Sequence, residues 1–326
     1  MIIRLKPEVD AAKAEAMGVE LKSHVIRENG SYVLITPSAL KSVAEKYQPL
    51  VKEQLVFNDD IQLASKKFTG GVREIALSDS LKLGGNTNNT LVITGPCSVE
   101  SETQIEAAAK LCVELGVKVL RAGAFKPRTS PYTFQGLGLE GLKLLGKMRE
   151  KYGLKVITEV RDSTHFDLVK EHADIIQVGA KAMYDHGILK GCAKSGKPVL
   201  LKRGFGSTLQ EFVQAAEFIL SGGNPNVMLC ERGIRTFETK TRFTLDLCGV
   251  AYLKEHVNLP VVLDPSHAIG YAYGVADLSR ACVAMGIDGL LIETHPDPSV
   301  AKSDASQQLN FEQFTSLYKS CASIGS

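Results

Sequence analysis

Short apolar runs recur along the chain from residue 91 onward, and each run is followed by a segment with helical spacing of apolar residues. The runs are Leu91–Thr94, Lys118–Arg121, Lys155–Thr158, Ile175–Val178, Pro198–Leu201, Val227–Cys230, Pro260–Leu263 and Gly289–Glu293. Continuous apolar strands that alternate with amphipathic helices are typical of a buried parallel sheet. Eight of them predict a closed (β/α)8 TIM barrel. An open flavodoxin-like or Rossmann-like sheet is the alternative, but the one GxGxxG spacing, at residues 136–141, follows no strand.

The first 57 residues have a different pattern. Strands are expected at Ile2–Lys6, Glu20–Arg27, Ser31–Thr36 and Val51–Phe57, and helices at Glu8–Met17 and Ser38–Tyr47. This βαββαβ order predicts a small ferredoxin-like α+β domain, and an N-terminal arm without a fold of its own is the alternative. A polar linker, Asn58–Lys67, gives domain boundaries of 1–67 and 68–326. After it we expect a strand at Arg73–Ala76 and a loop at Ser78–Thr90, which is rich in Gly, Asn and Ser.

Composition narrows the class of protein. The chain has 326 residues, 44% hydrophobic and 23% charged, with a net charge of +2. These values fit a soluble globular protein and give no reason to expect a nucleic acid or an anionic membrane as partner. The N-terminus lacks the apolar core of a signal peptide, and no apolar run approaches the ~20 residues of a membrane helix. We therefore expect a cytoplasmic protein, in which most of the seven scattered cysteines are buried thiols.

Charged residues gather where the predicted strands end. In a barrel of this type the loops after the strands build the active site. Any one of these cations could be a solvated charge on the rim, but a group of them in one funnel would repel one another unless an anion lay between them. The sequence therefore predicts a site for a ligand, or two ligands, with several negative charges. The cations are Arg121, Lys126, Arg128, Lys181, Lys202, Arg203 and Arg232.

A second group of strand-end residues could bind a metal. Cys97, His267, Glu293 and Asp304 follow the first, seventh and eighth runs, which become neighbours when a barrel closes. A thiolate, an imidazole and carboxylates together suit a divalent transition metal such as Zn, Mn, Fe or Co. A buried core cysteine and a hydrogen-bonded histidine would give the same residues, so spacing alone leaves both interpretations open.

The strand-end motifs resemble those of 3-deoxy-D-arabino-heptulosonate 7-phosphate (DAHP) synthase, in the subgroup with an N-terminal ferredoxin-like domain. The motifs are Gly95-Pro96-Cys97-Ser98, Lys126-Pro127-Arg128-Thr129, Leu201-Lys202-Arg203-Gly204, Glu231-Arg232-Gly233-Ile234-Arg235-Thr236, Asp264-Pro265-Ser266-His267 and Ser303-Asp304. The resemblance implies the first step of the shikimate pathway, in which phosphoenolpyruvate condenses with erythrose 4-phosphate. It also implies one divalent metal ion, held by Cys97, His267, Glu293 and Asp304.

The resemblance also implies roles for the cations. Those expected around phosphoenolpyruvate are Arg121, Lys126, Lys181, Lys202 and Arg232, and Gln177, on the fourth run, is a further candidate substrate contact. Arg128 and Thr129 are expected to hold erythrose 4-phosphate. A related synthase makes 3-deoxy-D-manno-octulosonate 8-phosphate from arabinose 5-phosphate, but it has a Lys-Ala-Asn-Arg-Ser type of sequence at this loop. The Lys126–Thr129 segment therefore favours the four-carbon sugar.

The expected proton chemistry falls to three residues. Lys126 is the candidate to protonate the developing alkoxide, and Glu159 is the candidate to orient the attacking water. His267 and a metal-bound water compete for these proton roles.

Two segments depart from the family pattern: Lys181-Ala182 replaces an Arg-Asn pair, and Ala268–Tyr273 replaces a basic stretch.

The N-terminal domain supports a second class of function. It resembles the domain that in some relatives binds an aromatic amino acid and closes over the barrel mouth, so inhibition by tyrosine or phenylalanine is one expectation. A domain that only stabilises an oligomer is the other. Relatives are commonly tetramers, and a homo-oligomer is expected here.

Overall fold

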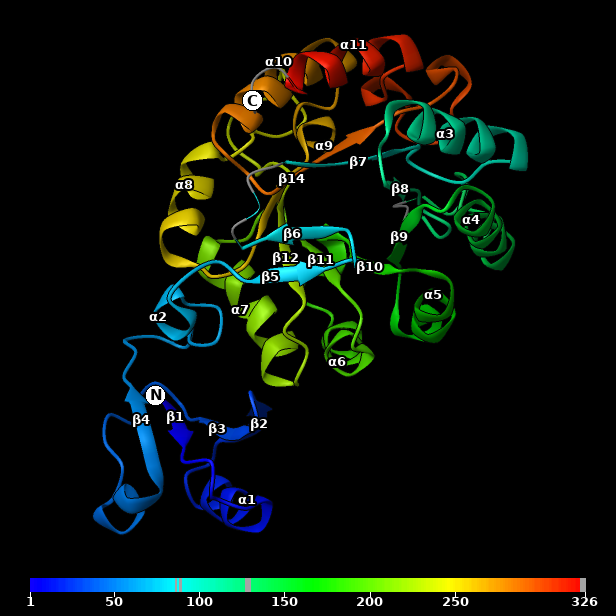
Figure 1. Cartoon of the computed structure of the whole chain (residues 1–326). Coiled ribbons are helices and arrows are strands. Elements are labelled where there is room, and N and C mark those ends of the chain that lie inside the picture. Colours follow the sequence, from blue (N-terminus) through cyan, green and yellow to red (C-terminus); the bar gives the residue numbers. More distant parts are fainter. Residues whose placement is uncertain (86, 88–89, 127–129, 323–326) are drawn as a thin grey trace.

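The computed structural model describes residues 1–322 except 86, 88–89 and 127–129, and its main body is a closed parallel barrel (Figure 1). The barrel closes because the last strand pairs with the first, with Leu290 opposite Val92. This closure confirms the predicted barrel and excludes the open sheet. The strands are β7 (Leu91–Gly95), β8 (Val119–Arg121), β9 (Lys155–Val160), β10 (Ile175–Val178), β11 (Val199–Lys202), β12 (Val227–Glu231), β13 (Val261–Leu263) and β14 (Gly289–Glu293).

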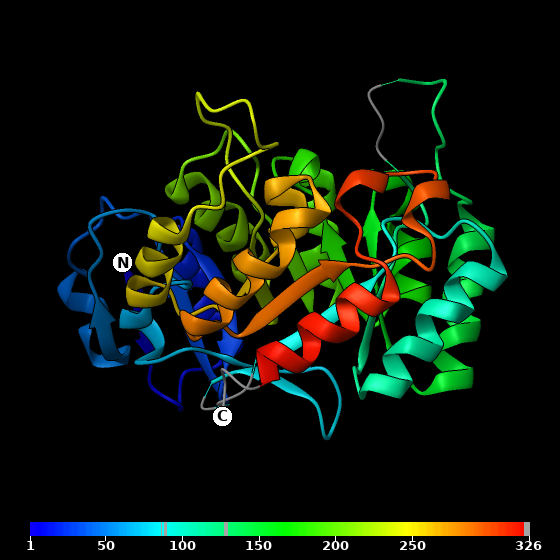
Figure 2. The same cartoon turned by 90° about the horizontal axis from the view of Figure 1, so that it is seen from above.

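Helices surround the barrel (Figure 1), and the orange and red helices near the C-terminus lie in front of its strands in Figure 2. A representative one, α7 (Leu209–Ser221), begins at a capping box in which Thr208 and Glu211 satisfy each other's backbone N–H groups, and it buries Phe212, Ala216 and Ile219 against the sheet. The other helices are α3 (Glu102–Leu115), α4 (Leu139–Tyr152), α5 (Phe166–His172), α6 (His186–Ser195), α8 (Leu247–His256), α9 (Pro265–Ile269), α10 (Ala272–Ala284) and α11 (Phe311–Ala322). Single 3-10 turns are η2 (Ser163–His165), η3 (Ala180–Ala182), η4 (Pro298–Val300) and η5 (Ala305–Gln307).

A hairpin closes the barrel at the end where its strands begin. The expected strand β5 (Glu74–Ala76) is present, but the expected loop after it was wrong in part, because Lys82–Gly84 forms strand β6. Ile75 pairs with Leu83, and both side chains join the apolar cluster inside the barrel. Burial of this apolar pair outweighs the loop-forming composition around it.

The N-terminal unit is a four-stranded antiparallel sheet in the order β2-β3-β1-β4. It consists of β1 (Ile2–Leu5), α1 (Ala11–Glu20), β2 (His24–Glu28), β3 (Ser31–Ile35) and β4 (Val51–Leu55). The expected helix at residues 38–47 was wrong, because only a 3-10 helix, η1 (Glu45–Leu50), is present. Val43 packs into the small core instead, and Lys41 donates a hydrogen bond to the Phe57 carbonyl, so tertiary contacts override helix propensity.

The segment between the two units is tied to the barrel. Glu217 on α7 accepts hydrogen bonds from the backbone N–H groups of Gln62 and Ala64, both at 2.7 Å. Asn258 binds the carbonyls of Leu63 and Ser65, just before the short helix α2 (Lys66–Thr69). The N-terminal unit consequently lies beside α7 (Figure 1), at the flank of the barrel and next to the loop that precedes β12.

Candidate active site

The two-residue period of the strands places the polar side chains of the site directly above the apolar interior. Six strands each place an apolar residue in the cluster inside the barrel, and the residue two positions later on the same strand is polar or charged. Because alternate residues of a strand share a face, the second set also points into the barrel, one layer nearer its mouth. The pairs are Val119 and Arg121, Ile157 and Glu159, Ile175 and Gln177, Leu200 and Lys202, Val262 and Asp264, and Leu291 and Glu293.

A cavity of about 460 Å³ opens at the mouth. Its wall brings together four of the cations expected from the sequence and adds Arg235 and Arg242, which the sequence reasoning missed. Arg235 belongs to a quoted motif, but it lies beyond the strand end, and only the folded loop returns it to the cavity. The guanidinium of Arg235 lies over the Phe205 ring, 4.8 Å from its centroid. The cations lining the cavity are Lys126, Lys181, Lys202, Arg232, Arg235 and Arg242.

Arg232 is the most buried arginine on this wall. It is 5% exposed, its guanidinium lies 4.4 Å from the centroid of Phe243, and its Nη1 has no hydrogen-bond partner among the described residues. Burial lowers the pKa of Arg232, against the raising effect of the Asp264 charge. A buried guanidinium N–H without a partner is costly, so this atom is placed to receive an anionic ligand.

Arg203 does not join the cavity. Its Nη1 donates to Glu231 at 2.9 Å and to Asp246 at 2.8 Å, and its Nη2 donates to the Ser207 carbonyl. These acceptors lie away from the ligand space, so Arg203 holds the loop after β11 in place. The sequence predicts a cation at this strand end, but it does not predict the direction in which the Arg203 side chain points.

Arg121 and Gln177 lie beneath the cavity and are almost completely buried. The Nη1 atom of Arg121 is 2.5 Å from Glu293 Oε1, and its Nε donates to Gln177 Oε1 at 3.2 Å. Gln177 in turn donates from Nε2 to Glu159 Oε2 at 2.7 Å. Glu159 has room there because residue 179 is glycine: a Cβ on Gly179 would lie 2.2 Å from Glu159 Oε1.

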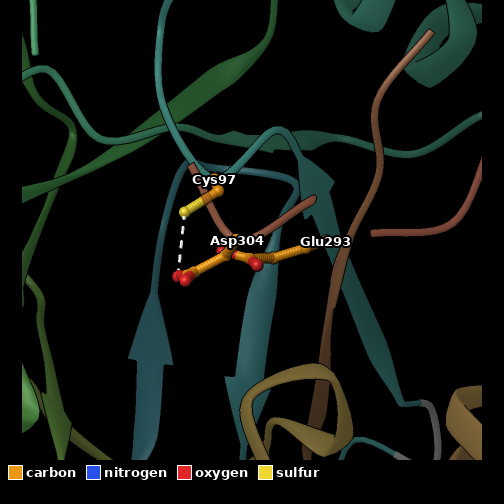
Figure 3. Close-up of side chains that lie close together, drawn as sticks. All are labelled: Cys97, Glu293 and Asp304. Carbon is orange, nitrogen blue, oxygen red and sulfur yellow. Dashed lines mark hydrogen bonds between the residues drawn. The ribbon is translucent and has the colours of Figure 1, made fainter. Parts of the chain in front are cut away.

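Three of the four expected metal ligands form one cluster (Figure 3). Ligand atoms of Cys97, Glu293 and Asp304 all lie within 4.8 Å of one another. His267 lies at the side of the cluster, with Nε2 3.4 Å from Glu293 Oε1 and 4.0 Å from Asp304 Oδ2. Asp304 sits in the left-handed backbone region with φ of 44°, a conformation that Asp tolerates better than most residues.

The other ring nitrogen of His267 lies 2.7 Å from Asp264 Oδ2, and Lys202 Nζ reaches the same carboxylate at 2.5 Å. The His267 contact lacks hydrogen-bond geometry, but the carboxylate lies beside Nδ1 and leaves Nε2 facing Glu293 and Asp304, an orientation common to metal-binding histidines. Burial lowers the pKa of His267, so the ring favours its neutral, ligand-competent form. Contacts with His267 and with the Lys202 ammonium outweigh burial and hold the pKa of Asp264 well below its usual range.

The cluster has the electrostatics of a cation site. Burial, with the charges of Glu293 and Asp304, raises the pKa of the Cys97 thiol to about 12. The thiol donates to Asp304 Oδ2 at 3.3 Å and lies 3.0 Å from Lys126 Nζ. A buried thiol between two carboxylates gains most from a bound cation, which would convert it to the thiolate. The donor set of thiol, imidazole and carboxylates therefore fits a divalent transition metal.

Lys126 connects the metal cluster to the anion cavity. Its Nζ is 3.3 Å from the Cys97 carbonyl and also lines the cavity. Burial lowers the pKa of Lys126, but the neighbouring Cys97 sulfur and the Glu159 and Glu293 carboxylates raise it by more, and the net shift is upward. The expected sugar-phosphate residues Arg128 and Thr129, which follow Lys126, lie outside the described residues.

Comparison with known proteins places this site in a family. The DAHP synthetase I family matches residues 74–324. The chain belongs to the DAHP synthetase I family. A phospho-2-dehydro-3-deoxyheptonate aldolase of Thermotoga maritima is 42% identical over 325 residues, which cover 97% of this chain and 95% of that protein. The crystal structure of the Thermotoga maritima DAHP synthase matches with a TM-score of 0.79 and 38% identity, over 99% of this chain and 96% of that one.

The other branch of the superfamily matches less well. A 2-dehydro-3-deoxyphosphooctonate aldolase of Syntrophotalea carbinolica is 32% identical over 270 residues, which cover 76% of this chain and 96% of that protein. The DAHP synthase function expected from the motifs is thereby confirmed, and the octulosonate alternative has the weaker support. Within the described residues, no helix is long and apolar enough to span a membrane.

Proposed function

We propose that the chain condenses phosphoenolpyruvate with erythrose 4-phosphate and releases DAHP and inorganic phosphate. The observation that carries this proposal is the cation-lined cavity of about 460 Å³ beside the Cys97–Glu293–Asp304 cluster. Two phosphorylated substrates bring several negative charges into one space, and six cations of the described residues line it. The cations hold both anions together, which converts a two-body encounter into a local reaction.

The reaction assigns separate tasks to the residues around the cavity. C3 of phosphoenolpyruvate attacks the aldehyde carbon, so a carbon–carbon bond forms, the aldehyde oxygen becomes an alkoxide, and positive character develops at C2. Lys126 donates a proton to that alkoxide, because its Nζ lies between the anion cavity and the ligand cluster. Water adds at C2, and in the resulting hemiketal the C2–O bond to the phosphate breaks while the C2 hydroxyl proton leaves with the phosphate, which gives the C2 ketone. Glu159, on the cavity wall, orients that water and accepts its proton.

A divalent metal ion is part of the proposal, and Mn, Zn, Fe and Co all suit the donors. Cys97, His267, Glu293 and Asp304 would hold it, and when bound it would supply Lewis-acid polarisation of the aldehyde. Asp264 keeps His267 in the orientation that this role needs. Arg121 neutralises part of the Glu293 charge and carries its own positive charge beneath the cavity floor.

The remaining cations bind substrate. Lys181, Lys202 and Arg232 line the cavity, where they would surround the phosphate and carboxylate of phosphoenolpyruvate. Gln177 belongs to the same polar layer, although both of its amide atoms already have protein partners. Arg128 and Thr129 are proposed to hold the sugar phosphate on the basis of their motif.

Choice of aldose is the decisive test of this function. The purified protein is assayed with phosphoenolpyruvate and either erythrose 4-phosphate or arabinose 5-phosphate, with and without a chelator. Turnover with the four-carbon sugar that stops on chelation and returns with added metal supports the proposal. A clear preference for arabinose 5-phosphate would transfer the chain to the octulosonate synthases.

For the N-terminal unit we propose a ferredoxin-like, regulatory role, with tyrosine or phenylalanine as the inhibitor and a homotetramer as the assembly. The strand order β2-β3-β1-β4 and the position of α1 between β1 and β2 support the fold assignment, whereas η1 stands where the fold has its second helix. The unit lies at the flank of its own barrel, so it does not cover the mouth of the same chain. Inhibition by millimolar amino acid, lost when residues 1–65 are deleted, would support regulation. Unchanged inhibition after deletion, or none in the full chain, would leave the unit a structural role.

A further inference from the structure

Gln177 joins two functional side chains that come from different strands. It lies on β10 with its side chain fully buried, and β10 pairs with β9 so that Gln177 stands directly opposite Glu159. This register places the Gln177 amide nitrogen 2.7 Å from Glu159 Oε2. On its other side, the amide oxygen accepts from Arg121 Nε at 3.2 Å.

The contacts continue across the barrel. Arg121 donates from Nη1 to Glu293 Oε1, and the second oxygen of Glu293 accepts from Gln307 Nε2 at 2.6 Å. A chain of hydrogen bonds therefore runs from Glu159 through Gln177 and Arg121 to Glu293. It crosses from the cavity wall, where Glu159 is exposed to ligand, to the cluster of proposed metal ligands.

A glutamine amide is well matched to this position. Arg121 offers only donors and the Glu159 carboxylate offers only acceptors, and an amide presents one acceptor and one donor group to satisfy both. A carboxylate at residue 177 would repel Glu159, and a cation would repel Arg121. Because buried polar groups are costly without partners, the occupied amide fixes both neighbours in one arrangement.

Direct contact with substrate is the competing role for Gln177. The described residues that line the cavity include Glu159 but neither Gln177 nor Arg121. Gln177 is 0% exposed, and its amide oxygen and nitrogen already have partners. Because no part of the side chain is exposed, a ligand would reach it only if the side chains that cover it moved.

We infer that Gln177 is a positioning residue, which sets the Glu159 carboxylate relative to Arg121 so that the water adds at C2 of the enol phosphate. This inference rests on the proposed function. Loss of the amide should therefore lower kcat, because the water is misplaced. The affinity for phosphoenolpyruvate should change little. A substrate contact would have the opposite effects.

The test uses two variants of the full-length protein. Gln177→Met keeps the size and removes both hydrogen bonds, whereas Gln177→Glu keeps an acceptor for Arg121 and removes the donor to Glu159. Ile176→Val is the matched control, since Ile176 lies on the same strand but packs in the outer apolar cluster between sheet and helices. Steady-state kinetics give kcat and KM, and calorimetric titration gives the dissociation constant of phosphoenolpyruvate without the sugar.

For both Gln177 variants we expect kcat to fall about 10- to 100-fold, the range typical for loss of a partner that orients a reacting group. The dissociation constant of phosphoenolpyruvate should change less than about threefold in Gln177→Glu, whose contact with Arg121 remains. Metal content should match that of the wild type. The control should keep both constants.

Two outcomes would overturn the inference. One is a tenfold weaker binding of phosphoenolpyruvate in Gln177→Glu with kcat unchanged, which would make Gln177 a substrate contact. The other is equal kinetics in the Gln177 variants and Ile176→Val, which would make its role structural. A wild type without turnover of the proposed substrates is a different result, because it refutes the proposed function before the variants are compared.

Discussion

Glu217 anchors the inter-domain segment, and replacing it with glutamine should change how stability depends on pH. Its Oε1 accepts hydrogen bonds from the backbone N–H groups of Gln62 and Ala64. Burial raises the pKa of this carboxyl from 4.5 to about 7, against the lowering effect of those hydrogen bonds and of Arg73. Above pH 7 the folded protein therefore carries a charge that its surroundings disfavour.

The raised pKa determines whether stability rises or falls with pH. As pH falls from 7 toward 4.5, the folded state takes up a proton that the unfolded state lacks, so wild-type stability rises. A shift of about 2.5 units corresponds to about 3 kcal/mol at most, and partial solvent contact of Glu217 lowers this to about 1–3 kcal/mol. Glu217→Gln keeps a carbonyl acceptor and removes the charge, so it loses this dependence.

Urea unfolding of both proteins at pH 5.5 and pH 8.5 measures the effect. The variant should be more stable than wild type by about 1–3 kcal/mol at pH 8.5, and less than half of this difference should remain at pH 5.5. Glu211→Gln is the control, because Glu211 lies on the same helix but is exposed at its N-terminal cap. It should show no gain at high pH. Parallel stability curves for wild type and Glu217→Gln across this range would refute the reasoning.

Three further changes test the site. Cys97→Ala should reduce bound metal, measured by elemental analysis, and abolish metal-dependent turnover while circular dichroism stays that of a folded barrel; full activity after chelation would contradict the metal proposal. Arg121→Met strands the buried Glu293 charge and should lower the free energy of unfolding by about 3–5 kcal/mol, measured by denaturation, whereas a loss below 1 kcal/mol would show that the pair is not buried in solution. Asp264→Asn weakens the contacts to Lys202 and His267 and should lower kcat and metal affinity about 10- to 100-fold. Metal affinity equal to that of the wild type would show that Asp264 does not orient His267 for the metal.

The barrel could be predicted from the sequence because its strands are buried on both faces. A run such as Ile175–Val178 is apolar throughout except for Gln177, and that pattern has few other structural explanations. The second N-terminal helix was predicted wrongly, because the Ser38–Tyr47 segment has helical spacing but is held by contacts to residues 57 and 60. Local pattern carries no information about such distant partners.

Some residues of the candidate site could likewise be predicted from the sequence, and others could not. Residues at strand ends, such as Lys202 and Glu293, were found because strand period and barrel topology fix where they point. Arg235 and Arg242 were missed because a loop returns them to the cavity, and Arg203 was misjudged because its acceptors come from Glu231 and Asp246. Loop paths and side-chain direction depend on packing, which spacing does not encode.

Competition between the two sugars shows in one experiment which product the protein makes. Phosphoenolpyruvate is supplied with equal concentrations of erythrose 4-phosphate and arabinose 5-phosphate to the metal-loaded protein, and the two products are separated by mass. We expect the seven-carbon product, DAHP, to predominate, and we expect a chelator to stop its formation. Predominance of the eight-carbon product, or unchanged product formation in the chelated protein, would contradict the proposal.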